Sequence, residues 1–181
     1  GHLKPDYGDV IFKSEYLNKL DLHQRIKKGI GLKFQAPSIF NEMTVLENLE
    51  IAANETNLEK YDDFIKRFGF FEEKNSLAGD LSHGKKQWLD IALASISNPD
   101  LVLLDEPTAG LSFEETKKTG EIIKYLNKQG TTFLIVEHDM EILKQIATTV
   151  SVLHLGAMFV EGTPESVLKN KDVAKIYLGV S

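Results

Sequence analysis

Asp100-Leu101-Val102-Leu103-Leu104-Asp105-Glu106-Pro107-Thr108 is the stretch that decides the fold of this chain. Its four consecutive apolar residues predict a strand buried on both faces, because a half-exposed strand would alternate polar and apolar side chains. Pro107 has no amide hydrogen to donate to a sheet, so the strand should end there. Ligands of open parallel sheets bind at the carboxyl ends of strands. The acid pair is therefore suited to a metal ion at Asp105 and a polarised water at Glu106, unless both acids are merely solvated.

Composition limits the classes of protein that this chain can represent. Its 181 residues suffice for one domain with a small subdomain, and 42% hydrophobic with 27% charged residues is ordinary for a globular protein. The absence of cysteine excludes disulfides and thiolate metal sites. A net charge of −6 gives no general electrostatic reason to bind nucleic acid or anionic lipid. The sequence contains no apolar run long enough for a membrane span, so the expected location is the cytosol.

Strand-like and helical patterns alternate along the chain, which predicts an α/β fold with a mainly parallel sheet. Strands are expected at 10–12, 29–35, 101–105 and 131–136, and a hairpin at 150–155 and 158–161. Helices are expected at 19–28, 44–54, 58–68, 82–97 and 112–130, from about 140, and from 163. Two of these helices begin with capping-box spacing, at Thr44-Glu47 and Ser112-Glu115.

Three further segments carry polar groups at places where such sheets bind ligands. His138 follows an apolar strand, as Glu106 does, so both should reach the same sheet edge. A lone histidine is, however, more often a structural hydrogen-bonding group than a catalytic one. Ser82-His83-Gly84 at a helix N-terminus offers a hydroxyl, free amide groups and the positive end of the helix dipole, which suits a phosphate, although a plain serine cap is also common. Gln35, at the end of another strand, indicates little by itself.

In this order and spacing, the motifs resemble those of the ATP-binding-cassette (ABC) ATPases, the nucleotide-binding subunits of ABC transporters. Gln35 matches the Q-loop glutamine of that family, and His138 matches its switch histidine. Segments 81–85, 101–106 and 109–112 match the signature motif, the Walker B strand and the D-loop. The resemblance implies a P-loop NTPase sheet with a small inserted helical subdomain. It divides the chain into an α/β core at 1–43 and 99–181 and a helical subdomain at 44–98.

Some segments are similar to one branch of that family, which serves importers of branched-chain amino acids, urea or amides. They are Lys86-Gln87-Trp88-Leu89 after the signature, 105–111, 137–140 and 176–179. The similarity is greatest to the ATP-binding subunit of urea-type importers. It implies a second ABC ATPase subunit and membrane permease subunits as partners, and a location at the inner face of the cell membrane. A helix of the permease would then dock near Gln35–Phe40, including Ile39, and the helix that begins at Thr44.

The resemblance also implies roles for the motif residues, with ATP and Mg²⁺ as cofactors. Asp105 would hold Mg²⁺ through water and Gln35 would join the metal. Glu106 would polarise the attacking water, and His138 would contact the γ-phosphate. In the family, two such domains pair and trap ATP between them.

The signature segment of one domain faces the nucleotide held by the other. Ser82 and Gly84, with His83 and Lys85 in the same segment, would therefore contact the ATP of the opposite subunit. Two residues depart from the family pattern: Lys85 stands where glutamine is usual, and Ser112 stands where many D-loops have an acid.

The sequence contains no P-loop, the Gly-x-x-x-x-Gly-Lys-[Ser/Thr] motif that cradles phosphates in this class. Gly79–Lys86 nearly matches, but Lys86 replaces the Ser or Thr that would bind Mg²⁺, and no apolar strand precedes it. We interpret this segment as the signature motif. The chain is therefore expected to correspond to an ABC ATPase without its N-terminal P-loop segment, and to be inactive alone.

Two other functions fit parts of this pattern. A truncated cassette could act as a non-catalytic interaction module. A DNA-repair or chromosome-organising ATPase would carry the same motifs, but such proteins insert a long coiled coil between the Q-loop and the signature. The segment between Gln35 and Ser82 has room only for a compact helical insert.

Overall fold

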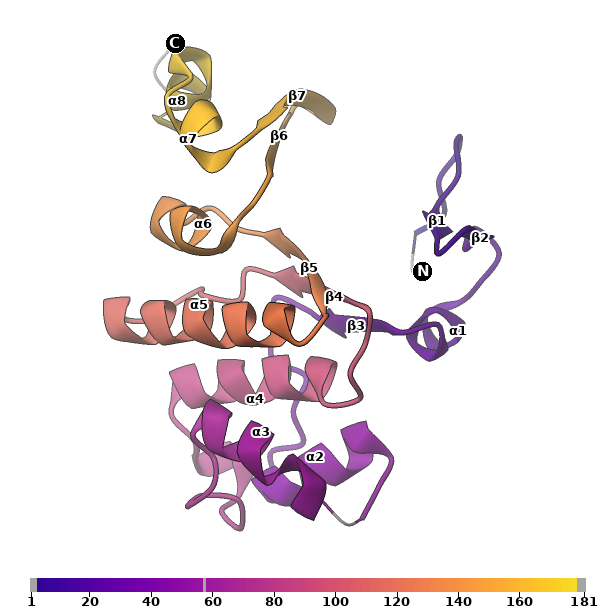
Figure 1. Ribbon diagram of the computed structural model, residues 1–181, viewed down its shortest axis with the longest axis vertical. Helices are drawn as coiled ribbons and strands as arrows, with labels where there is room; N and C mark the ends of the chain where they lie inside the picture. Colours follow the sequence, from indigo (N-terminus) through magenta and orange to yellow (C-terminus); the bar gives the residue numbers. More distant parts are fainter. Residues whose placement is uncertain (1–2, 57, 179–181) are drawn as a thin grey trace.

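A parallel three-stranded sheet lies at the centre of the computed structural model, which describes residues 3–56 and 58–178. Strand β4 (Leu101–Asp105) pairs with β3 (Ile30–Lys33) on one side and β5 (Thr132–Val136) on the other. The register sets Lys33 beside Leu104 and Asp105 beside Val136, so the three strands end at one edge of the sheet (Figure 1). The expected α/β fold with a mainly parallel sheet is confirmed.

Two antiparallel ribbons accompany this sheet. The first pairs β1 (Ile11–Phe12) with β2 (Glu15–Tyr16), and the second pairs β6 (Val150–His154) with β7 (Ala157–Gly162). The second ribbon is the predicted hairpin. Strand β2 was not predicted, since a two-residue strand carries no periodicity; its turn puts Lys13 and Ser14 at positive φ (49° and 63°).

Eight α-helices occur among the described residues. They are α1 (Leu22–Lys27), α2 (Val45–Ala53), α3 (Asp62–Phe68), α4 (His83–Ser95), α5 (Phe113–Lys128), α6 (Met140–Ile146), α7 (Pro164–Leu168) and α8 (Lys171–Leu178). Both predicted capping boxes are present, at Thr44 and Ser112. The helix expected over 58–68 is instead a 3-10 turn, Glu59–Tyr61, followed by α3. None of the described helices has the length and apolar character needed to cross a bilayer.

Helices α4 and α5 cover one face of the sheet (Figure 1). Val102 and Leu104 lie on that face and are buried, at 0% and 2% exposure. The opposite face is open at β5, where Leu134 and Val136 are 62% and 61% exposed. The prediction that β4 is buried on both faces is therefore wrong for this structure. Its burial alternates along the strand, as expected for a strand whose one face is covered by helices α4 and α5.

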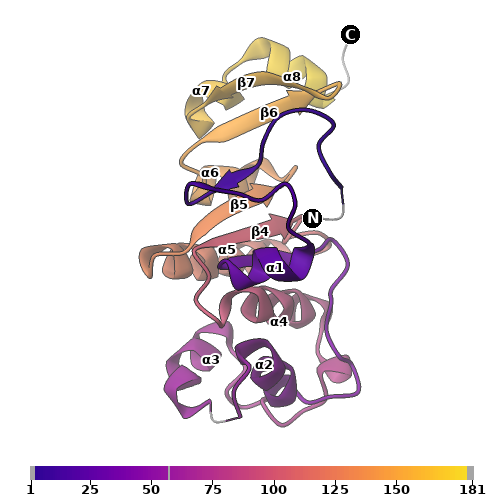
Figure 2. The ribbon, with the colours of Figure 1, turned by 90° about the vertical axis from the view of Figure 1, so that its right-hand side faces the viewer.

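Helices α2 and α3 lie at one end of the molecule, and β6, β7, α7 and α8 lie at the other (Figures 1 and 2). One hydrophobic core joins the first group to the sheet. Its fully buried members include Val45, Leu49, Phe68, Leu89 and Val102. Helix α4 belongs to both layers, since it packs on α2 and also on β3. The division into a core and a helical subdomain at 44–98 stays a prediction. Of the expected branch motif at 176–179, Gly179 lies outside the described residues.

Candidate active site

The carboxylate of Glu106 lies between two of the residues singled out from the sequence. Its Oε2 accepts a hydrogen bond from Gln35 Nε2 at 3.0 Å, and its Oε1 lies 3.5 Å from His138 Nδ1. The three residues follow β3, β4 and β5, which end side by side. A carboxylate, an amide and an imidazole from distant parts of the sequence therefore meet at the carboxyl edge of the sheet.

The backbone at Glu106 turns sharply to present this carboxylate. Its φ is +44°, in the left-handed region that residues other than glycine seldom adopt, while its amide still donates to Val136 O at 2.9 Å. Such conformations persist where surrounding contacts enforce them and are concentrated at functional sites. The Glu106 side chain is 29% exposed and that of His138 is 66% exposed, so both are open to a ligand from solvent.

Asp105 and Gln35 were predicted to hold Mg²⁺, and their donor atoms fit a metal that keeps most of its water. The Asp105 side chain is at the exposed end of β4. Gln35 uses its amide nitrogen on Glu106, which leaves the amide oxygen for another partner. Mg²⁺ is commonly bound through one or two protein oxygens together with substrate phosphates and waters. No cluster of three or more acidic, histidine or cysteine side chains that could hold a metal by itself occurs within 3–56 and 58–178.

Ser82 caps the N-terminus of α4, where its Oγ accepts the amide of Lys85 at 3.4 Å. The next residue, His83, places Nε2 3.1 Å from Ala109 O in the segment after β4. A Cβ on Gly84 would lie 2.1 Å from Glu115 Oε1, so only glycine fits there without displacing the capping box of α5. In the described part of the chain, no hydrogen bond or ion pair joins these residues to Glu106 or His138. The signature segment is held against the N-terminus of α5 instead.

Lys85 forms an ion pair with Glu73, and both side chains are 34% exposed. Its charge is therefore neutralised within the same chain in this structure. The near-match to a P-loop at Gly79–Lys86 has none of the strand–loop–helix geometry of a phosphate cradle. It runs from a 3-10 turn, Ala78–Asp80, through the Ser82 cap into α4.

Three polar residues around the site, Glu137, Lys33 and Asp90, were not among the site residues predicted from the sequence. Glu137 accepts the Thr108 amide at 2.9 Å through Oε1 and the His138 amide at 3.1 Å through Oε2, and so ties together the segments that follow β4 and β5. Lys33 and Asp90 are buried behind the site, at 0% and 3% exposure. Burial lowers the pKa of Lys33, and burial raises the pKa of Asp90 to about 6 against the pull of Lys33. A lysine inside a short apolar strand was the one signal that could have revealed this pair.

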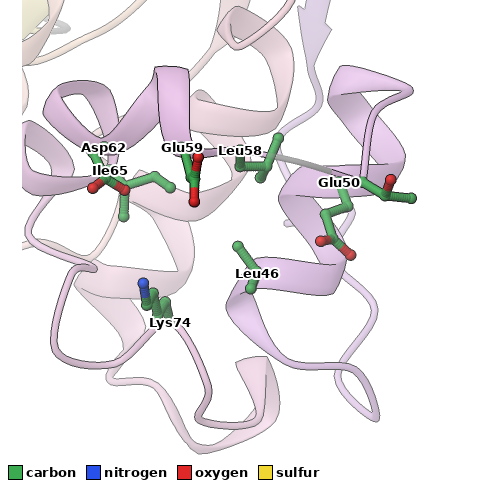
Figure 3. A pocket seen from close by; sticks show the side chains of 8 residues that line it. Leu46, Glu50, Leu58, Glu59, Asp62, Ile65 and Lys74 are labelled. Atoms are coloured by element: carbon green, nitrogen blue, oxygen red, sulfur yellow. The ribbon is translucent and has the colours of Figure 1, made fainter.

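A separate pocket lies between α2 and α3, on other elements than those that carry Glu106 (Figure 3). Leu46, Leu58 and Ile65 form its apolar part, with acidic side chains around them. Its volume of about 230 Å³ is below the roughly 300–1,000 Å³ of typical small-molecule sites. The pocket therefore does not compete with the sheet edge as the candidate active site.

Comparison with known proteins places this geometry in a family. Residues 1–109 match the family model described as ABC transporter. The chain is 33% identical to the high-affinity branched-chain amino acid transport ATP-binding protein LivG of Escherichia coli (strain K12), over 99% of this chain and 79% of that protein.

Solved structures give the same answer. The ADP conformation of MJ1267, an ATP-binding cassette of an ABC transporter, is 30% identical with a TM-score of 0.86, over 99% of this chain and 80% of that one. A dimeric post-hydrolysis state of the cassette MJ0796 bound to ADP and Pi is 25% identical with a TM-score of 0.76, over 90% and 76% of the two chains. The chain therefore belongs to the ABC transporter family and has the fold of its ATP-binding cassettes.

Proposed function

We propose that this chain is the ATP-hydrolysing subunit of an importer for branched-chain amino acids, urea or amides. The position of the Glu106 carboxylate between Gln35 and His138 carries the catalytic part of the proposal. The likeness to LivG, whose name specifies branched-chain amino acid transport, supports the transport part. Urea and amides rest on the sequence resemblance described above.

In this proposal, hydrolysis is the attack of water on the γ-phosphate of ATP. Glu106 accepts a hydrogen bond from that water and polarises it, while Gln35 fixes the orientation of the Glu106 carboxylate. His138 donates to the γ-phosphate from the other side of Glu106. Mg²⁺, when bound by Asp105 and Gln35, neutralises charge on the phosphates. Positioning and charge neutralisation account for most of the catalysis in phosphoryl transfer.

The signature segment has a different proposed partner. Ser82 and Gly84 lie at the N-terminus of α4, where free amides favour an anion, and no hydrogen bond or ion pair joins them to Glu106 in the described part of the chain. We therefore assign them to ATP bound by a second cassette, with His83 and Lys85 beside it. The dimeric state of MJ0796 supports such pairing. The pair would lie at the inner face of the cell membrane on its permease subunits.

The test is ATP hydrolysis by the chain joined to an N-terminal P-loop segment and assembled with its partner ATPase and permease subunits, because the 181 residues include no P-loop. Glu106→Gln keeps the shape of the side chain but removes the base, so the rate should fall by about 10²–10⁴-fold while ATP binding by the complex persists. Glu161→Gln is the matched control, because Glu161 lies on β7 and bonds Ser151. An unchanged rate in Glu106→Gln would reject the catalytic role.

The second candidate function is a non-catalytic interaction module. It is the alternative that the sequence leaves open, and it would apply to a cassette that does not hold ATP at Glu106. A complex that transports equally well with wild-type chain and with Glu106→Gln would establish this alternative.

A further inference from the structure

Lys33 is the last residue of β3, and its side chain is fully buried. Its Nζ donates to Phe34 O at 3.0 Å and to Asp105 O at 3.4 Å. These are the carbonyl groups that immediately precede Gln35 and Glu106. The buried Lys33 ammonium therefore holds the peptide group before Gln35 and the peptide group before Glu106. The side chains of these two residues are hydrogen-bonded to each other.

Asp90 supplies the opposite charge from α4. Its Oδ1 accepts the amide of Ser38 at 3.3 Å, in the segment that follows Gln35. Its Oδ2 has no hydrogen-bond partner among the described residues. A buried carboxylate with a free oxygen is unfavourable unless a cation lies near it. Lys33 is the cation whose attraction offsets the burial of Asp90.

Core filling alone does not explain this pair. Neighbouring positions on the same face of the sheet are filled by Val102 and Leu104, and apolar residues would occupy the space of Lys33 and Asp90 at lower cost, since buried charges lose their hydration. The same face also shows how closely α4 approaches β3, because a Cβ on Gly31 would lie 2.1 Å from Ala94 O. Both charges are thus enclosed between α4 and the strand that leads to Gln35.

We propose that Lys33 and Asp90 act together as positioning residues, which fix Gln35 and Glu106 at the strand ends and connect both to the signature helix α4. Lys33 acts through the carbonyl groups of Phe34 and Asp105, and Asp90 acts through the Ser38 amide and through Lys33. The catalytic meaning of this arrangement rests on the proposed function. The arrangement itself is a property of the chain.

Amide hydrogen exchange of the 181-residue protein, followed by mass spectrometry, tests the arrangement directly. Lys33→Met and Asp90→Asn should each speed exchange in 34–40 and 105–108 by about tenfold, the change expected for one lost charge-assisted hydrogen bond. The double variant Lys33→Met/Asp90→Asn should exchange only slightly faster than the faster of the two single variants, because the effects of two residues that act as a unit do not add.

Thr119→Val is the control, since it removes the buried hydrogen bond from Trp88 Nε1 to Thr119 Oγ1, 2.9 Å long, without touching the strand ends. This variant should speed amide exchange in α4 and α5 and leave the exchange rate in 34–40 unchanged. Exchange that rises evenly over the protein in Lys33→Met, or effects that add fully in the double variant, would show that the two residues only stabilise the fold.

ATP hydrolysis by the assembled complex separates this inference from the proposed function. If the wild-type complex hydrolyses ATP, Lys33→Met should lower kcat about tenfold or more with little change in KM, because binding groups stay in place while the base is displaced. An unchanged kcat would overturn the positioning role. A wild-type complex without hydrolysis would count against the proposed function, and the exchange comparison would still decide the inference.

Discussion

Gln35 and Glu106 lie 71 positions apart in the sequence and are joined by a 3.0 Å hydrogen bond from the glutamine amide to the glutamate carboxylate. Parallel pairing of β3 and β4 brings the two residues together, since both strands end at the same edge. The contact gives the Glu106 carboxylate a fixed orientation beside His138.

This contact predicts the effect of placing a second acid next to Glu106. Gln35→Glu would bring two carboxylates within about 3 Å, and their repulsion should raise the pKa of one of them by one unit or more. The acidic limb of the pH–rate profile of the assembled ATPase should therefore move to higher pH. Gln35→Ala should lower the rate without moving that limb. Identical pH profiles for the two variants would contradict the proposed role of Glu106 as the base.

The isolated chain is expected to bind ATP weakly and to hydrolyse none above background. The sequence contains no phosphate-cradling P-loop, and the nearest match, Gly79–Lys86, runs into α4 as a capped helix start. Isothermal titration with ATP and Mg²⁺ measures this directly. Micromolar affinity for the chain alone would contradict the prediction.

Phe40 is the better of two positions for testing permease coupling. The sequence resemblance implicates both Ile39 and Phe40, but Ile39 packs against the core while Phe40 is 54% exposed. Hydrogen bonds from Phe40 N–H and to Phe40 O involve the Asn48 side chain, so the backbone should keep its position after substitution. Phe40→Asp should abolish transport driven by ATP while nucleotide binding by the complex persists.

Phe159→Asp serves as its control, because Phe159 on β7 is also a partly exposed phenylalanine (44%). Normal transport by a complex that carries Phe40→Asp would place the permease contact elsewhere.

Asp90 should make the stability of the chain depend on pH. Its folded-state pKa of about 6 lies above the ordinary value of 3.8, because burial disfavours the charged form. The neutral acid therefore favours folding fully below about pH 4, and this contribution is lost as pH rises to about 6. The loss corresponds to roughly 3 kcal/mol in the free energy of unfolding. Asp90→Asn carries no ionisable group there and should lack this decline.

Urea denaturation of wild type and Asp90→Asn at several pH values between 4 and 7 measures the difference. Other acids also contribute to the pH dependence of stability, such as Glu47 and Glu115, whose pKa values are lowered by hydrogen bonds from their capping partners. These contributions are the same in both proteins, so they cancel in the comparison. Parallel stability curves for the two proteins would show that Asp90 does not titrate in this range.

Local sequence patterns predicted most of the secondary structure and indicated the family. The apolar run at 101–104, followed by Asp105-Glu106-Pro107, identified β4 and its end, and the spacing at Thr44 and Ser112 identified two capped helices. These signals could be read directly because the apolar run of a strand, helix capping and the proline break depend on residues close together in the chain.

Contacts between distant segments were decided only by the tertiary structure. Lys33 and Asp90 carry no local signal of being buried together, since their burial depends on how closely α4 packs on β3. The one-sided covering of β4 likewise depends on which side of the sheet α4 and α5 occupy, and an apolar strand has no pattern that records this. The sequence alone could therefore identify Glu106, Gln35 and His138 as candidate site residues. Only the packing of α4 on the sheet determines how Lys33 and Asp90 lie behind them.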